Sequence, residues 1–148
     1  MPSETNNHIQ KVNARESASI TRLIESLDEN NWTIWRERMY RVLKVCRVLP
    51  YVEGTVACPD KEAHPEDFAA WEFNDSYAQC LISNNIVANQ MINVTRLHTA
   101  REMWTSLEAV HESRGHQYAI TLMRSLFRTC AEEGDDLVEH LNKLKEMW

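Results

Sequence analysis

The segment from His111 to His116 is where the sequence comes nearest to a metal site. It reads His-Glu-Ser-Arg-Gly-His. The zinc-protease motif H-E-x-x-H places its two histidines on one face of a helix, which requires a spacing of four residues. Here the spacing is one residue longer, and Gly115 is expected to end the helix before His116. The sequence therefore favours a helix end at this point over a zinc site.

Two pairs of adjacent carboxylates, Glu132–Glu133 and Asp135–Asp136, flank Gly134. A catalytic pair of acids needs a cleft that separates the two pKa values, whereas acids just before a helix usually act as caps. The sequence contains no glycine-rich phosphate loop and no G-x-S-x-G motif, and its cysteines are not at zinc spacing. We therefore predict that the chain is not an enzyme and carries no cofactor or metal.

A row of cations marks the outer side of the first predicted helix. Four of these cations could form a patch that weakly binds RNA or an acidic partner: Arg38, Arg41, Lys44 and Arg47. The alternative is a solvated face whose cations interact favourably with a helix C-terminus. The net charge of −6 favours the solvated face, because an acidic chain repels nucleic acid on average.

The elements that would position these residues are predicted to be helices. The chain has 148 residues, of which 43% are hydrophobic, and only three are glycine and four are proline. All-β folds need both of these residues for turns, so the composition favours an all-α fold with one main core. No apolar run reaches the roughly 18–20 residues of a membrane span, and residues 1–19 lack the apolar core of a signal peptide. We therefore expect an intracellular protein without a membrane partner.

The apolar spacing predicts about five to seven helices in a compact bundle. Residues 1–22 are polar and are predicted to form a flexible arm, and residues 23–132 to form the helical domain. The first helix is expected from about Asn31 to Leu49, where Pro50 would end it, and a loop to follow from Tyr51 to His64. The next helix is expected to begin at Pro65, a favoured first-turn residue. Residues 83–95 predict a further helical turn or two.

The clearest helix start is at Thr99, which with Glu102 forms the pattern of a capping box. We predict that this helix ends at Gly115 and that a second follows over about 116–130. Residues 133–148 would then begin a last helix, or a truncated C-terminal domain. That helix carries an apolar stripe that we expect to bind a missing C-terminal portion or a neighbouring subunit: Leu137, Leu141, Leu144 and Trp148.

Four tryptophans fall mostly on apolar stripes, and we expect them to lie in the core rather than to stack on a ligand. They are Trp32, Trp35, Trp71 and Trp104. All four also belong to an ordered set of short motifs.

These motifs resemble the Gag polypeptide of copia-type long-terminal-repeat retrotransposons. Leu27 to Trp35 resembles the family's L-x-x-x-N-(Y/W)-x-x-W, although Asn30 and Asn31 stand where many relatives have glycine. Val52-Glu53-Gly54 is similar to the family's V-x-G, and Trp71 is followed by Asp75 and Ala78. Thr99 to Leu107 resembles T-A-x-E-x-W-x-x-L. The similarity covers about residues 23–148.

The resemblance implies a capsid protein with the fold of a retroviral-type N-terminal capsid domain. It implies that copies of the chain assemble into a virus-like particle that packages RNA, in the cytoplasm or alternatively the nucleus, and that no small-molecule substrate is bound. The contact surfaces would be the exposed side of the first helix, the loop 51–64 and the C-terminal stripe.

Two other classes of function stay open at this stage. One is a host adaptor domesticated from Gag, which binds partner peptides or proteins in its helical grooves. The other is an enzyme with a cryptic metal site at His98, His111 or His116.

Overall fold

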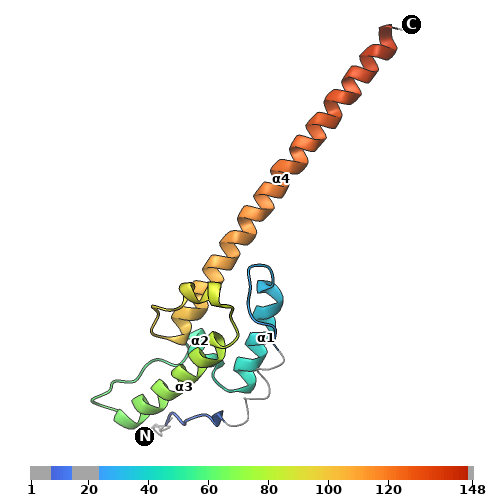
Figure 1. Ribbon diagram of the computed structural model, residues 1–148. Coiled ribbons are helices and arrows are strands. Elements are labelled where there is room, and N and C mark those ends of the chain that lie inside the picture. The colour runs from blue at the N-terminus through green and yellow to red at the C-terminus, as the bar shows by residue number, and fades with distance from the viewer. Residues whose placement is uncertain (1–7, 15–23, 147–148) are drawn as a thin grey trace, which may run out of the picture. The chain divides into compact units, whose positions relative to one another are not determined.

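The computed structural model describes residues 8–14 and 24–146, with side chains described as far as residue 129. Its helical elements follow in the order α1 (Trp32–Val45), α2 (Leu49–Glu53), α3 (Pro65–Ser83), the 3-10 helix η3 (Ala88–Asn93) and α4 (Ala100–Glu146) (Figure 1). The described ranges contain no β-strand, only an isolated parallel bridge between Leu27 and Ile86. The predicted all-α class is therefore confirmed.

The chain divides into two units, the first ending at Val110 and the second running from His111 to Trp148. The boundary predicted between residues 132 and 133 falls inside α4 and stays a prediction. The first unit contains α1, α2, α3, η3 and the first eleven residues of α4. In the second unit α4 supplies the described structure.

The first helix is shorter than predicted, and Pro50 does not end it. α1 stops at Val45 because the chain turns at Arg47, whose φ of 60° is left-handed. The N–H of Val48 donates to the Leu43 carbonyl at 3.0 Å, and the N–H of Arg47 donates to the Lys44 carbonyl at 3.1 Å. This pair of bonds is a Schellman motif, which satisfies the last carbonyls of a helix.

Pro50 instead lies in the first turn of α2, so part of the predicted loop 51–64 is helical. Proline suits a first turn because its missing N–H has no helical partner there in any case. α2 ends at Gly54, whose φ of 71° is the left-handed conformation that glycine adopts without steric cost.

α3 begins at Pro65 as predicted, with Glu66 and Asp67 in its first turn, where acids interact favourably with the helix dipole. Its buried face is partly polar, because Asn74 and Asp75 are 1% and 3% exposed. Each of these two polar side chains binds backbone groups of another part of the chain, which is how a helix can carry them inside.

The predicted capping box at the start of α4 is confirmed. The Glu102 carboxylate accepts hydrogen bonds from the N–H groups of His98 and Thr99 at 2.8 and 3.2 Å. The hydroxyl of Thr99 in turn accepts a bond from the Glu102 N–H at 3.2 Å. These bonds pair three backbone N–H groups near the helix start.

The prediction that Gly115 ends a helix is wrong. α4 is continuous from Ala100 to Glu146 and includes both Gly115 and Gly134, so the two helices predicted after Gly115 are parts of α4. A terminating glycine takes a positive φ, and among the described glycines only Gly54 does so. Glycine inside a helix costs about 1 kcal/mol relative to alanine, which strong helix formers on either side can offset.

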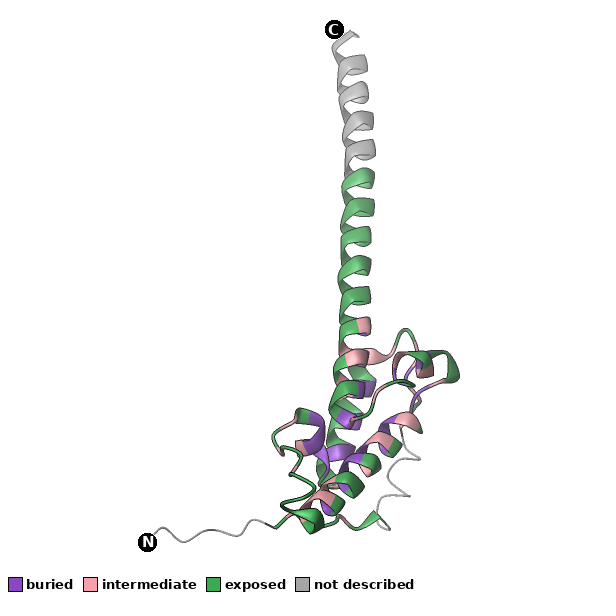
Figure 2. Ribbon diagram, turned by 90° about the vertical axis from the view of Figure 1, so that its left-hand side faces the viewer, coloured by how far each residue is buried: buried purple, intermediate pink, exposed green. Residues whose placement is uncertain are grey.

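The core lies where α1, α2 and α3 meet the start of α4 (Figure 2). Its fully buried side chains include Leu27, Trp35, Met39, Leu43, Ile82 and Leu107. They come from segments far apart in sequence, so the core forms only when the helices pack together. No helix among the described residues is long and apolar enough to cross a membrane.

Candidate functional site

Three of the four predicted core tryptophans form one cluster between α1 and α4. The ring centroids of Trp32 and Trp35 lie 5.8 Å apart, those of Trp35 and Trp104 5.9 Å, and those of Trp32 and Trp104 6.1 Å. Trp35 is 1% exposed, and its indole N–H donates to the Asn85 carbonyl at 2.7 Å. Trp32 and Trp104 are half-buried against the core. Contacts at these separations stabilise a small core beyond the area that they bury.

Trp71 lies apart from this cluster, on α3. Its ring centroid is 6.2 Å from that of Tyr51 in α2, and its indole N–H donates to the Val56 carbonyl at 3.1 Å. Trp71 thus ties the loop after α2 to α3.

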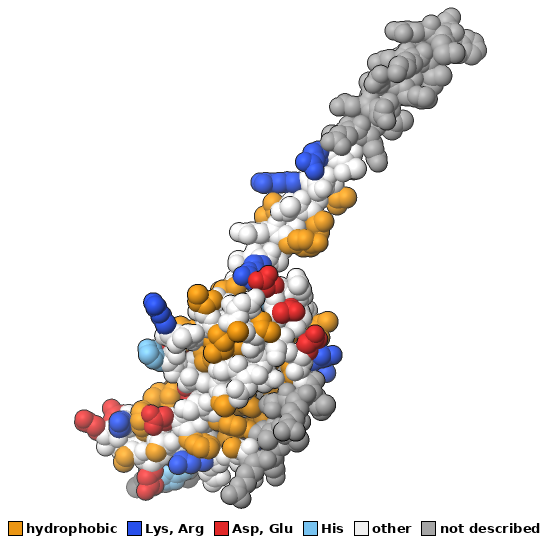
Figure 3. All heavy atoms as spheres, viewed as in Figure 1, with side chains coloured by type: hydrophobic (Ala, Val, Ile, Leu, Met, Phe, Trp, Pro, Cys, Tyr) orange, Lys and Arg blue, Asp and Glu red, His pale blue; other side chains and the backbone are white. Residues whose placement is uncertain are grey.

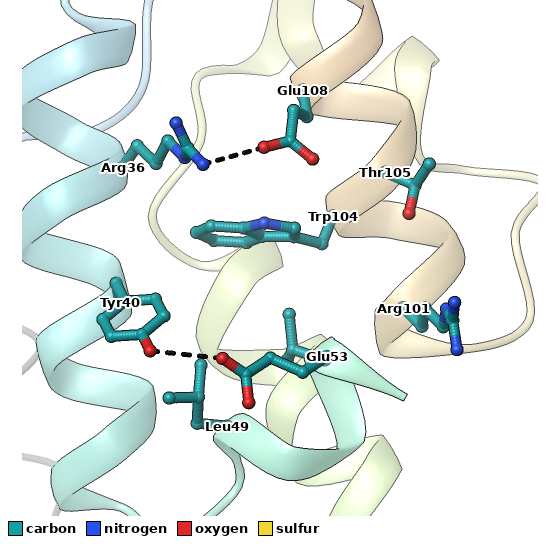
Figure 4. Close-up of a pocket in the computed structure, with 9 residues that line it drawn as sticks. Arg36, Tyr40, Leu49, Glu53, Arg101, Trp104, Thr105 and Glu108 are labelled. Atoms are coloured by element: carbon teal, nitrogen blue, oxygen red, sulfur yellow. Dashed lines mark hydrogen bonds and ion pairs between the residues drawn. The ribbon is translucent and has the colours of Figure 1, made fainter. Parts of the chain in front are cut away.

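The half-buried ring of Trp104 forms part of a pocket of about 300 Å³ in the first unit (Figure 4). The lining residues come from α1, α2 and the first turns of α4: Arg36, Tyr40, Leu49, Val52, Glu53, Arg101, Trp104, Thr105 and Glu108. In Figure 4 the Trp104 ring lies between an ion pair and a hydrogen bond. The guanidinium of Arg36 is 3.0 Å from the Glu108 carboxylate, and the Tyr40 hydroxyl donates to Glu53 at 3.2 Å.

Gly54 follows the lining residue Glu53 and lies beside Arg101. Besides needing its positive φ, Gly54 leaves room for the Arg101 side chain, with which a Cβ at this position would collide. The Arg101 guanidinium also lies 3.5 Å from the Gly54 carbonyl oxygen, at the long limit for a hydrogen bond. The V-x-G motif therefore has a structural reason here.

The charges in the pocket suit binding rather than acid–base catalysis. The phenol of Tyr40 is protonated at neutral pH in any case, and the hydrogen bond to Glu53, together with that carboxylate's negative charge, raises its pKa further above the ordinary value of 10. Arg36 already neutralises Glu108. The remaining lining includes the apolar side chains of Leu49 and Val52. Such a pocket offers an aromatic surface, apolar walls and paired charges to a peptide side chain.

No pattern in the sequence indicated this pocket as a site. Tyr40, Glu53 and Glu108 come from three helices, and no local spacing predicts that they meet. The available signals were the V-x-G motif and Trp104, and neither indicated a pocket.

A comparison with known protein families shows to which family the chain belongs. The model of the gag-polypeptide of LTR copia-type matches residues 39–148. The chain belongs to this family. No curated protein and no solved structure matches it.

The Gag family match begins at Met39 and contains Gly54, Asp75 and Trp104. The motif that ends at Trp35 precedes the match, yet Trp35 stacks on Trp104 inside it. The asparagines that replace glycine in that motif form a turn of their own. Asp28 accepts bonds from the N–H groups of Asn30 and Asn31, and Asn31, with a φ of −106°, needs no glycine.

The four cations proposed as a weak patch on this Gag chain are all exposed. Arg38, Arg41 and Lys44 lie on α1, and Arg47 lies in the turn that follows it. Arg36, on the same helix, is instead paired with Glu108 in the pocket. The structure thus separates the pocket arginine from the four cations of the candidate patch.

The predicted C-terminal stripe, Leu137, Leu141, Leu144 and Trp148, lies outside the described side chains. Nearer residues of α4 carry exposed apolar side chains that the structure does describe: Tyr118, Ile120, Leu122, Met123, Leu126 and Phe127. Figure 3 shows apolar side chains gathered along this part of the helix.

The histidines of the H-E-x-x-H-like segment do not form a metal site in the described part of the chain. His111 and His116 are both in α4, and the His116 ring donates to the Glu112 carbonyl at 3.0 Å. No group of three His, Cys, Asp or Glu side chains in the searched ranges could hold a metal ion.

Proposed function

We propose that this Gag chain is a capsid subunit, many copies of which associate into a virus-like particle that packages RNA. The observation that carries the proposal is the exposed apolar face of α4 between residues 118 and 127 in a chain of the Gag family. A structural protein of this kind needs repeated contacts between identical copies.

The apolar face is sharply separated from a polar one. Met123, Leu126 and Phe127 are 61%, 64% and 74% exposed, and their spacing of three or four residues places them on one side of the helix. The other side of the same turns carries Gln117, Thr121, Arg124, Ser125 and Arg128. A helix with this division normally packs its apolar side against another element.

The sequence beyond residue 129 repeats the same spacing. Leu137 follows Leu126 by eleven residues and Leu144 follows it by eighteen, which are close to three and five helical turns. The predicted C-terminal stripe would therefore extend the described face. We propose that the two together bind a second copy, with the exposed side of α1 and the segment 51–64 as further contacts.

Association should respond to charge placed on this face. Leu126→Asp and Leu141→Asp should each lower the mass measured by light scattering over a wide range of concentrations. The matched control is Thr121→Asp, on the polar side of α4, which should associate like the parent. Negative-stain microscopy of the same samples distinguishes rings or shells from small oligomers.

A parent chain that is a strict monomer at every concentration would overturn self-association by this chain. Equal association of the parent, Leu126→Asp and Leu141→Asp would instead place the contact elsewhere, for example on α1 or on segment 51–64.

The pocket at Trp104 favours a second candidate function, an adaptor that binds partner peptides. Its test is selection from a peptide library with the parent chain, followed by binding to Glu108→Ala. A peptide that binds both chains equally would not occupy this pocket.

RNA binding through the exposed cations of α1 is a separate part of the capsid proposal. It predicts an affinity for single-stranded RNA that falls steeply with salt. Replacing Arg38, Arg41 and Lys44 with glutamine should reduce both the affinity and its salt dependence.

A further inference from the structure

Residues 8–14 lie against α3 and are held there mainly through their backbone. The Val12 N–H donates to the Asn74 side-chain oxygen at 2.9 Å. The Asn74 side-chain nitrogen donates to the Gln10 carbonyl, also at 2.9 Å. One amide therefore pairs with a donor and an acceptor two residues apart, much as a neighbouring β-strand would.

A hydrogen bond to α2 holds the Asn74 side chain in this orientation. Its side-chain nitrogen also donates to the Tyr51 hydroxyl in α2 at 2.8 Å, and the residue is 1% exposed. A buried amide costs free energy unless its donors and acceptor are paired. In this structure the segment 8–14 supplies two of those partners. The asparagine is thus placed to bind a peptide backbone rather than to pack.

Contacts of the segment's side chains near Asn74 make the binding depend on its sequence. Ile9 and Val12 pack against the core, three residues apart in sequence. The Asp67 carboxylate accepts a bond from the Ile9 N–H at 3.2 Å and lies 3.1 Å from the His8 ring nitrogen. The pattern recognised is a histidine, then an apolar residue, then a second apolar residue three positions later.

An ammonium group of the same segment interacts with an aromatic ring of α3. The Lys11 nitrogen lies 5.6 Å from the centroid of the Phe73 ring, which is within the range of a cation–π contact. Backbone pairing, two apolar anchors and this contact together make a peptide site along α3.

We propose that this face of α3 is a binding site for an extended segment, that its ligand is the sequence His8–Val12, and that in assemblies the ligand comes from a second copy. Exchange between copies preserves every contact just described, so it requires little free energy beyond that of association. The segment buries few apolar groups, so it should open locally far more easily than a core does.

The length of the connection permits the exchange. Nine residues lie between Ala14 and Ile24, and a chain of that length can reach about 30 Å. That distance is comparable to the diameter of a small domain. The inference rests on the contacts at Asn74 and not on the apolar face of α4.

The first experiment tests the site in the full chain. Ile9→Asp with Val12→Asp disables the resident segment, and a synthetic peptide of residues 7–14 is then titrated against the ¹⁵N-labelled variant. Saturable shifts of the Asn74 side-chain amide support the site, and shifts of the backbone amides of α3 report binding in variants that lack this side chain. Adding Asn74→Leu should weaken binding roughly tenfold or more, since it removes both backbone bonds. Glu72→Ala, an exposed change on the same helix, is the matched control.

A milder variant guards against loss of folding. Val12→Pro keeps an apolar residue but removes the one N–H that Asn74 accepts, so it should free the site without placing a charge beside the core. If neither disabled chain binds the peptide while both stay folded, the site does not exist.

The second experiment tests exchange. The labelled chain with a disabled segment is mixed with unlabelled Asn74→Leu chain, which has an intact segment but a disabled site. If copies exchange, the Asn74 amide signal moves to its position in the parent chain. An unlabelled partner that carries both defects gives the baseline and also controls for association through α4. Peptide binding without any shift in the mixture would overturn the exchange between copies.

Discussion

The carboxylate of Asp75, in the middle of α3, accepts a hydrogen bond at 3.0 Å from the backbone N–H of Ala100, the first residue of α4. The other carboxylate oxygen accepts a bond from the Gln79 side chain at 2.7 Å, and that amide also donates to the His98 carbonyl. α3 thereby caps the start of α4. Burial raises the pKa of Asp75 despite these bonds, so the charged form is held at some cost.

Asp75→Ala should lower the free energy of unfolding by about 1–3 kcal/mol, because it leaves the buried Ala100 N–H without a partner. The free energy of unfolding of Asp75→Asn should lie between that of the parent and that of Asp75→Ala. Its oxygen can still accept the Ala100 N–H, but its amide nitrogen would face the nitrogen of Gln79. Chemical denaturation at neutral pH measures the difference, with exposed Glu72→Ala as control. A stability of Asp75→Ala equal to that of the parent would contradict the role of this cap.

Gly54→Ala should destabilise the first unit by more than about 1 kcal/mol, since it combines a positive φ with a collision against Arg101. The double variant Gly54→Ala/Arg101→Ala should recover the part of the lost stability that is due to the collision. It should not recover the part that is due to the positive φ. Thermal denaturation of the two variants separates these contributions. No recovery in the double variant would show that Arg101 does not occupy this space.

Arg47→Gly should stabilise the chain by roughly 0.5–1 kcal/mol, because glycine adopts the φ of 60° at this helix end without steric cost. The same change at Arg41, an exposed position inside α1, should destabilise by about 1 kcal/mol. The opposite signs of the two changes, measured by urea denaturation, test the left-handed turn. Destabilisation by both would mean that α1 continues through Arg47.

Gly115→Ala should raise the helix content measured by circular dichroism, since α4 continues through this position and a Cβ there meets nothing within 4 Å beyond the nearby backbone of the helix itself. Gly115→Pro should lower it by breaking the helix. A lower helix content in Gly115→Ala would indicate that the helix ends at this glycine, as the sequence had suggested.

Acid should weaken the capping box at the start of α4. Hydrogen bonds from the N–H groups of His98 and Thr99, with the nearby His98 ring, hold the pKa of Glu102 below its ordinary value of 4.5. The carboxylate's contribution to stability is therefore complete above that value and is lost as pH falls through the lowered pKa. Glu102→Gln removes this titration.

The stability difference between parent and Glu102→Gln should accordingly shrink as pH falls below about 4.5. Taking the difference cancels Asp60 and Asp67, whose pKa values are also lowered. Asp75 cancels only in part, because repulsion from Glu102 is one of the causes that raise its pKa. Urea denaturation of both proteins across this pH range gives the measurement. A difference that does not change with pH would show that Glu102 makes no such bonds.

Local sequence was sufficient for features that depend on neighbours along the chain. The spacing of apolar residues predicted helices, Pro65 predicted the start of α3, and Thr99 with Glu102 predicted a capping box, because each interaction spans at most one helical turn. The family was also accessible from sequence, since short motifs in the right order need no contact between them.

Tertiary structure decided what depends on residues distant in sequence. The partner of Asp75 is 25 residues away and that of Asn74 is 62, and neither pairing has a local pattern. Gly115 was wrongly predicted to end a helix, because a glycine by itself does not show whether the helix continues through it. Sequence therefore determined the helical class, the clearest helix starts and the Gag family, while packing determined the pocket, the cap on α4 and the site for the N-terminal segment.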